Sequence, residues 1–295
     1  MAIASLLALC SCRAAVSTRS VPVIVAAYPD PQQQMLAALS IVLLRAEGFS
    51  IVERTRLQGE WHVRQALEAG SVHLAWQDSG TVWFTYLGHD QPVSSETSLF
   101  RNIKAEDYTH DIIWLTPLPW SNRQSIVIRA DRAAASRLSS IADLAQHISR
   151  VNPQMTICIP QPLATGPRGI AGLQRVYGFS FQPNNIREMA SADAVAAVLD
   201  GTCDCTVGSV KDLALYQGQL VILRDSSAFF PASSLAPTLH VTAINQYPEL
   251  ERILGGLTDA LDQKTLAGLE REAVQGRQTY LRVAERYLAT IGLID

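Results

Sequence analysis

The chain has 295 residues, of which 48% are hydrophobic and 17% are charged, and its 24 basic residues nearly balance its 27 acidic ones. This length and hydrophobic content suit one or two domains with buried cores. The near-balance of charge provides no electrostatic footprint for a nucleic-acid partner. No apolar run reaches the ~18 to 20 residues that a membrane-spanning helix needs.

The chain begins with a short apolar run that ends in the sequence LCSC at residues 9–12. Such a run predicts a secretory leader, although the usual cationic residues do not precede it and the first cation is Arg13. Either the assigned start lies too far downstream or the run is simply an apolar leader. Cys12 suits lipidation better than Cys10, because a small serine precedes Cys12 and a bulky leucine precedes Cys10. We expect residues 1–20 to be a leader and spacer with Cys12 as the lipidation site, the alternative being a frayed terminus without function.

A regular alternation of strand and helix patterns follows the leader. Residues 21–27 (VPVIVAA) form an apolar run typical of a buried parallel strand, and apolar spacing predicts a helix over residues 32–47. We expect a second strand over residues 49–54, a second helix over 61–69 and a third strand over 72–76. This order with short joints predicts a parallel sheet with helices on both faces.

The alternation starts again after residue 115 and predicts a second α/β unit inside the chain. We expect strands over residues 125–129, 155–159, 203–207 and 220–223, and helices over residues 140–149, 170–177, 192–199 and 210–216. A strand over residues 238–243 and three closing helices then return to the first unit.

This order predicts two α/β lobes, the second inserted in the first and joined to it by two crossing strands. We place lobe 1 at residues 21–119 and 231–295, and lobe 2 at residues 120–230. A binding protein that closes about a hinge has this arrangement.

Three cysteines follow the leader, namely Cys158, Cys203 and Cys205. Cys203 and Cys205 point to the same face if their segment is extended. An extracytoplasmic address permits a disulfide between Cys158 and either of them, and free buried thiols are at least as good an interpretation. Three cysteines without a close fourth ligand make a poor zinc site, and no histidines stand at metal-binding spacing, so we expect no metal.

Five motifs occur in order along the chain. They are LQGEWHVRQALEAG from residue 57, WQDSGT from residue 76, WLTPLPWSN from residue 114, GPRGIAGL with YGFSF from residue 166, and DSSAFFP from residue 225. Together they resemble the substrate-binding proteins of glycine betaine/choline-type ABC transporters, and the resemblance covers most of residues 21–294. It implies the fold of type II periplasmic binding proteins, in which two α/β lobes enclose a ligand cleft beside a two-strand hinge.

The resemblance also implies a function. It indicates an extracytoplasmic, lipid-anchored receptor that delivers a small solute to an ABC permease, with no cofactor and no catalysis. The implied ligand is a quaternary ammonium compound, which this family holds in a cage of aromatic rings while donors bind its carboxylate or hydroxyl. A cation against a ring face gains roughly 0.5 to 2 kcal/mol. We expect a monomer without a nucleic-acid partner.

Two tyrosines of the family's cage are absent from this chain, since ASS follows the FFP motif and VGSVKD stands where a tyrosine precedes the family's STDG. Two rings can still sandwich a cation, although a four-walled cage is not available from these positions. The residues that we expect to contact the ligand are Tyr28, Trp76, Asp78, Thr81, Trp120, Asn122, Arg168, Ser209 and Ser233.

Each of these candidates has an alternative interpretation. Trp76 and Trp120 supply rings for an ammonium group or pack in the core and the hinge. Tyr28 follows the first strand, at the edge where ligands of α/β proteins collect. Asp78 balances a ligand cation or caps a turn, and Arg168 holds a ligand carboxylate or is a surface charge.

Three other functions remain open. The same fold could bind another small solute, such as an amino-acid derivative, a polyamine or an organic anion. It could also serve as a sensory or chaperone-like binding module. An enzyme is disfavoured, because the chain contains neither a G-x-S-x-G nor an H-E-x-x-H motif.

Overall fold

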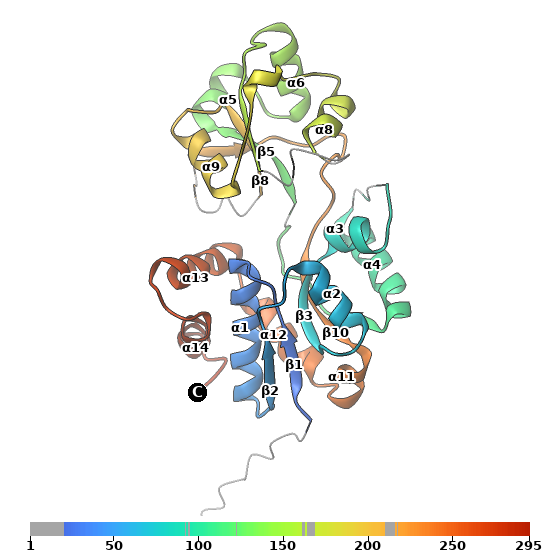
Figure 1. Ribbon diagram of the computed structural model, residues 1–295. Coiled ribbons are helices and arrows are strands. Elements are labelled where there is room, and N and C mark those ends of the chain that lie inside the picture. Colours follow the sequence, from blue (N-terminus) through green and yellow to red (C-terminus); the bar gives the residue numbers. More distant parts are fainter. Residues whose placement is uncertain are drawn as a thin grey trace, which may run out of the picture.

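The computed structural model describes residues 21–91, 93, 95–121, 123–160, 163, 169–209, 216 and 218–295. Within these residues the chain forms two lobes, each built on a five-stranded sheet that helices cover. Figure 1 shows lobe 2 above lobe 1, with two extended chain segments linking them. The fold is therefore the two-lobed α/β fold that the sequence predicted.

The sheet of lobe 1 has the strand order β2-β1-β3-β10-β4. These strands are β1 (Val23–Ala26), β2 (Ile51–Arg54), β3 (Leu74–Asp78), β4 (Ile112–Trp114) and β10 (Leu235–His240). β1 is parallel to β2 and β3, whereas β10 is antiparallel to both of its neighbours, so the sheet is mixed rather than parallel throughout. The returning strand from lobe 2 thus completes the first sheet.

Helix α1 (Pro31–Ala46) is the central helix of lobe 1. Asp30 caps it, because its Oδ1 accepts hydrogen bonds from the backbone N–H groups of Gln32 at 3.0 Å and Gln33 at 3.1 Å. The closing helices α12 (Leu250–Ala260), α13 (Gln263–Gln275) and α14 (Tyr280–Thr290) pack against α1 (Figure 1). Their apolar side chains join those of α1 in one core, which explains why α1 is buried on more than one face.

Four further helices complete lobe 1. They are α2 (Glu60–Glu68), the short α3 (Ser79–Thr81), α4 (Glu96–Asp107) and α11 (Val241–Gln246). Arg64 of α2 is fully buried and forms a bidentate ion pair with Asp107 of α4, at 2.8 and 2.6 Å. This pair joins α2 to α4.

The sheet of lobe 2 has the strand order β7-β6-β8-β5-β9. Its strands are β5 (Gln124–Arg129), β6 (Ile157–Pro160), β7 (Ile186–Met189), β8 (Cys205–Ser209) and β9 (Leu220–Ile222). Its helices include α5 (Ala130–Ser136), α6 (Ile141–Arg150), α8 (Ile170–Tyr177) and α9 (Ser191–Leu199). Ser140 and Asp143 form a capping box that fixes the start of α6.

Two crossing segments connect the lobes, residues 115–123 and residues 231–234. They run close together, because the Ser121 hydroxyl donates to the carbonyl of Ser233 at 3.3 Å. Backbone hydrogen bonds tie the first segment to β10, from Leu118 to Leu235 at 2.8 Å. The two segments form the hinge region between the lobes.

Most predicted elements are present, and several differ. α4 and β7 were not predicted, and the last strand begins at Leu235 and gives way to α11 after His240. Four closing helices therefore follow this strand instead of three. Residues 210–215 of a predicted helix lie outside the described residues. None of the helices described is long and apolar enough to cross a membrane.

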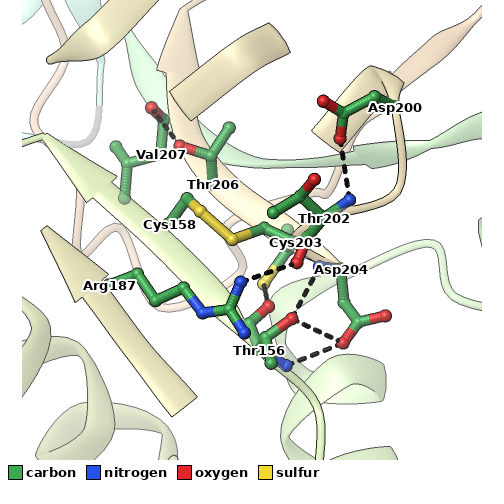
Figure 2. The surroundings of a disulfide bond; sticks show 10 residues. Thr156, Cys158, Arg187, Asp200, Thr202, Cys203, Asp204, Thr206 and Val207 are labelled. Atoms are coloured by element: carbon green, nitrogen blue, oxygen red, sulfur yellow. Dashed lines mark hydrogen bonds between the residues drawn. A yellow bond between two sulfur atoms is a disulfide. The ribbon is translucent and has the colours of Figure 1, made fainter. Parts of the chain in front are cut away.

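A disulfide joins Cys158 of β6 to Cys203, with the two Cα atoms 5.8 Å apart (Figure 2). Cys205 is a free, buried thiol. The expectation that Cys203 and Cys205 share a face is wrong, because the two side chains lie in different hydrophobic clusters. β8 begins only at Cys205, so the alternation of an extended strand does not reach Cys203. Beside the bond, Asp204 accepts hydrogen bonds from the backbone and the hydroxyl of Thr156.

Candidate ligand-binding cleft

A cavity of about 500 Å³ lies beside the crossing segments and is lined by both lobes. This volume suits a small organic solute. The lining residues of lobe 1 and the hinge are Tyr28, Gln32, Gln33, Glu60, Asp78, Gly80, Thr81, Phe84, Thr85, Pro231, Ser233 and Leu235. Those of lobe 2 are Gln124, Leu163, Phe229 and Phe230.

The lobe 1 wall is formed where the strands of the parallel part of the sheet end. Tyr28 follows β1, and the start of α1 places Gln32 and Gln33 beside it. Asp78 is the last residue of β3. Ligands of α/β sheets collect at this carboxyl edge, because the loops that leave neighbouring parallel strands meet there.

The Asp78 carboxylate connects the cleft with the hinge. Its Oδ1 accepts a hydrogen bond from the backbone N–H of Thr81 at 2.9 Å, so Asp78 caps α3. Its Oδ2 accepts a hydrogen bond from the hydroxyl of Ser233 in the second crossing segment. Next to this pair, the backbone N–H of Ser234 donates to the Ser79 hydroxyl at 2.8 Å. Asp78 therefore caps a turn and also lines the cavity.

Glu60 is the first residue of α2 and the second carboxylate of the cavity. Burial, together with the nearby carboxylates of Asp78 and Asp30, raises the pKa of Glu60 to about 7. Burial and the carboxylates of Glu60, Asp30 and Asp78 also raise the pKa of Tyr28, whose hydroxyl stays protonated. The lobe 1 wall thus combines an aromatic ring with a cluster of acidic groups.

Aromatic rings face the cavity from both lobes. Tyr28 and Phe84, the latter in the helical segment η1 (Val82–Tyr86), belong to lobe 1. Phe229 and Phe230 belong to the lobe 2 side and contact each other edge to face, with ring centroids 5.0 Å apart. Such ring faces can bind a cation.

A hydrogen-bonded loop holds the two lobe 2 rings in place. Asp225 accepts hydrogen bonds from the backbone N–H groups of Phe229 at 3.1 Å and Phe230 at 2.7 Å. It also accepts one from the hydroxyl of Tyr177 at the end of α8. Two of the motifs noted in the sequence, YGFSF and DSSAFFP, therefore meet at Asp225.

The structure brings together four of the predicted site residues. Tyr28, Asp78, Thr81 and Ser233 all line the cavity. The cavity also contains Glu60 and Phe84, together with Phe229 and Phe230, none of which was predicted as a site residue. The two phenylalanines belong to the DSSAFFP motif, and Glu60 follows Gly59 at a helix start, so signals for these three were present in the sequence.

The two predicted tryptophans lie elsewhere. Trp76 is only 2% exposed in the core of lobe 1, and its Nε1 donates to the Ser40 hydroxyl of α1 at 3.0 Å. It is a core residue, because its ring points from β3 toward α1. Trp120 packs against the same core and lines a separate cavity of about 370 Å³ at the hinge, together with Phe100 and Glu96. Neither tryptophan is among the described residues that line the main cavity.

Three predicted residues, Cys12, Asn122 and Arg168, lie outside the described residues. Ser209 ends β8, and its side chain is also outside the description. The roles expected for these four residues remain predictions.

Two lobes, a hinge of paired crossing segments and a polar and aromatic cavity beside it define a solute-binding protein of the periplasmic type. The family described as the substrate-binding domain of ABC-type glycine betaine transport systems matches residues 21–290. The chain belongs to this family. Its members are extracytoplasmic receptors that bind small solutes and work with a permease, and they are not enzymes.

Individual relatives agree with this assignment. The chain is 24% identical over 269 residues to a glycine-betaine-binding protein of Pseudomonas aeruginosa, which covers 90% of this chain and 86% of the relative. It is also 24% identical over 282 residues to the glycine betaine-binding protein YehZ of Escherichia coli, covering 92% and 91% of the two chains. A crystal structure described as a glycine betaine/carnitine/choline ABC transporter has the same fold, with a TM-score of 0.78 at 19% identity over 92% of this chain and 100% of that one.

Proposed function

We propose that this protein captures a quaternary ammonium solute of the glycine betaine/choline type in the cleft and delivers it to an ABC permease. The observation that carries the proposal is the meeting of aromatic rings from both lobes with two carboxylates in one cavity. Ring faces and carboxylates both attract an organic cation, and the attraction grows as water is excluded. Family membership supports the same class of solute.

Capture requires the lobes to close. Tyr28 and Phe84 lie on one side of the cavity and Phe229 and Phe230 on the other, so a solute that contacts all four rings favours the closed arrangement. The crossing segments are the hinge for this movement. The closed form is then the form that docks on the permease.

We also propose that the receptor is tethered to the membrane through a lipid on Cys12, after removal of the leader. The disulfide between Cys158 and Cys203 supports an oxidising, extracytoplasmic location. We also propose that the receptor acts as a monomer. Labelling with radioactive palmitate, compared between the wild type and Cys12→Ala, tests the anchor.

A thermal-shift screen of the purified chain tests the proposed solute. The panel contains glycine betaine, choline, carnitine, polyamines and amino acids. A solute at 100 times its Kd adds about 2.7 kcal/mol to the free energy of unfolding, which shifts the melting temperature visibly. A response to methylated ammonium compounds supports the proposal. A response only to polyamines or amino acids contradicts the ligand class and leaves the receptor, and no response at all contradicts both.

A further inference from the structure

We propose that the cleft selects organic cations that carry a hydroxyl or N–H donor and no carboxylate, in preference to zwitterions with the same ammonium group. This inference rests on the proposed function and narrows it. Among the described residues that line the cavity, Glu60 and Asp78 are the two charged ones, and both are acidic. A ligand carboxylate in the same cavity would be repelled by both of them.

Two of the three helix starts beside the cavity are already occupied by acidic side chains. The N-terminus of a helix ordinarily attracts anions through its free backbone N–H groups. Here Asp30 accepts the N–H groups at the start of α1, and Asp78 accepts that of Thr81 in α3. The first residue of α2 is Glu60 itself. The starts of α1 and α3 are thus already matched by acidic side chains of the protein. The start of α2 has no side-chain cap, but it carries the Glu60 carboxylate, which would lie beside any anion bound there.

The buried guanidinium of α2 is engaged by other side chains of the protein. Arg64, one turn after Glu60 in α2, donates to Asp107, to Glu68 at 2.6 Å and to Gln77 at 3.0 Å. The positive charge of Arg64 is balanced by the carboxylates of Asp107 and Glu68, so it is not available to balance the carboxylates of the cavity. Neutral donors such as Thr85 and Gln124 also line the cavity, and they hydrogen-bond any polar group without selecting its charge.

Glu60 is the acceptor that a ligand would use. Within the described residues, no hydrogen bond or ion pair reaches its carboxylate. The raised pKa of this carboxyl agrees with a buried acid that lacks a compensating partner. A ligand that brings a positive charge and a hydroxyl or N–H group supplies both missing interactions, whereas a zwitterion brings a second acceptor.

Calorimetric titration of the full chain with choline and glycine betaine tests the inference, because the two share a trimethylammonium group and differ in a hydroxyl against a carboxylate. We expect choline to bind at least about tenfold more tightly at pH 8. Glu60→Gln should lower the affinity for choline by about tenfold and should leave the affinity for glycine betaine unchanged or raise it. Glu53→Gln, in a surface ion pair with Arg45, is the matched control and should change neither affinity.

The outcomes separate this inference from the proposed function. If glycine betaine binds as tightly as choline, or if Glu60→Gln weakens both ligands equally, the selectivity is wrong while the quaternary ammonium receptor stands. If Arg168→Ala abolishes tight glycine betaine binding, a guanidinium outside the described residues provides the anion site and the inference is overturned. If neither compound binds, the proposed function fails and this inference fails with it.

Discussion

The hydroxyl of Ser233 donates a hydrogen bond to the carboxylate of Asp78, which joins a crossing segment to the cavity edge of β3. The carbonyl of the same Ser233 accepts a hydrogen bond from Ser121 in the other crossing segment. A solute that contacts Asp78 therefore acts next to both connections between the lobes. This arrangement links occupation of the cleft to the geometry of the hinge.

Ser233→Ala should weaken binding of the solute by about three- to tenfold. Asp78 loses a hydrogen bond that holds its carboxylate in place, and only part of the roughly 1.5 to 3 kcal/mol that such a bond to a charged group contributes is passed on to the solute. Titration calorimetry gives the affinity. Ser71→Ala, which removes a hydroxyl from an exposed position of lobe 1, is the control. Equal affinities of the Ser233 variant and the wild type would show that this hydrogen bond does not position Asp78.

The affinity for a cationic solute should depend on pH through Glu60. Its pKa is about 7 in the folded chain, so its carboxylate forms as the pH rises through neutrality. If the cation binds the ionised form, affinity rises by about tenfold between pH 6 and pH 8, and protons are released on binding. Titrations in buffers of different ionisation enthalpy measure the released protons. The Glu60→Gln variant should show neither effect.

The stability of the protein without solute should fall as the pH rises, whereas the affinity for a cation should rise. The folded-state pKa of Glu60 is raised above its ordinary value of 4.5. The contribution of Glu60 is therefore fully present below pH 4.5 and is lost as the pH rises through about 7. Glu60→Gln should raise the melting temperature at pH 8 and leave it almost unchanged at pH 4. A wild type that is stabilised relative to the variant at pH 8 would contradict the raised pKa.

Phe84→Ala should weaken binding of a quaternary ammonium solute by about tenfold, since one ring contact of roughly 1 to 2 kcal/mol is removed. Phe84→Tyr retains a ring at the same position and should bind within about threefold of the wild type. Because Phe84 is only partly buried, we expect both variants to melt within a few degrees of the wild type. Unchanged affinity of the alanine variant would show that Phe84 does not contribute to binding of the solute.

Loss of the disulfide should destabilise lobe 2. Its two cysteines are 45 residues apart in sequence, and a crosslink of this kind contributes about 2 to 4 kcal/mol. Cys158→Ala with Cys203→Ala should therefore lower the free energy of unfolding by this amount and make it insensitive to dithiothreitol. Cys205→Ala, which removes the free thiol, should keep the sensitivity of the wild type to the reductant. A double variant as stable as the oxidised wild type would contradict this prediction.

Trp76→Ala should destabilise the fold rather than weaken binding directly. Removal of a fully buried tryptophan costs about 3 to 5 kcal/mol, and Ser40 also loses its hydrogen-bond partner. Denaturant unfolding measures this loss. Affinity measured at a temperature where the variant is folded should remain close to that of the wild type. Weaker binding with an unchanged melting temperature would instead show that Trp76 contributes directly to the binding site.

The elements of the fold were largely predictable, because short apolar runs and helical spacing are local properties. α4 was missed, since its twelve residues contain few apolar ones and only Leu99, Ile103 and Asp107 are buried. The antiparallel return of β10 was also beyond local patterns. Strand direction within a sheet depends on where a distant segment of the chain pairs.

The site was predictable where it follows from topology, and less so where it depends on side-chain direction. Tyr28 follows β1 and Asp78 ends β3, both at the carboxyl edge, so their positions along the chain were sufficient to select them. Trp76 lies two residues before Asp78 in the same strand, yet its ring enters the core. Phe229 and Phe230 reach the cavity because Asp225 bends their loop, and this contact joins residues of different elements.

The hydrogen bonds to Asp225 have a consequence for the energetics of capture. A loop that orders only when a solute arrives loses conformational entropy at that moment, and the affinity falls accordingly. Here Tyr177 and the backbone of the loop are already bound to Asp225, so the ring pair of lobe 2 is pre-organised during folding. The remaining entropic cost of capture then falls mainly on the movement of whole lobes, which is set by the hinge and is nearly independent of which solute is bound.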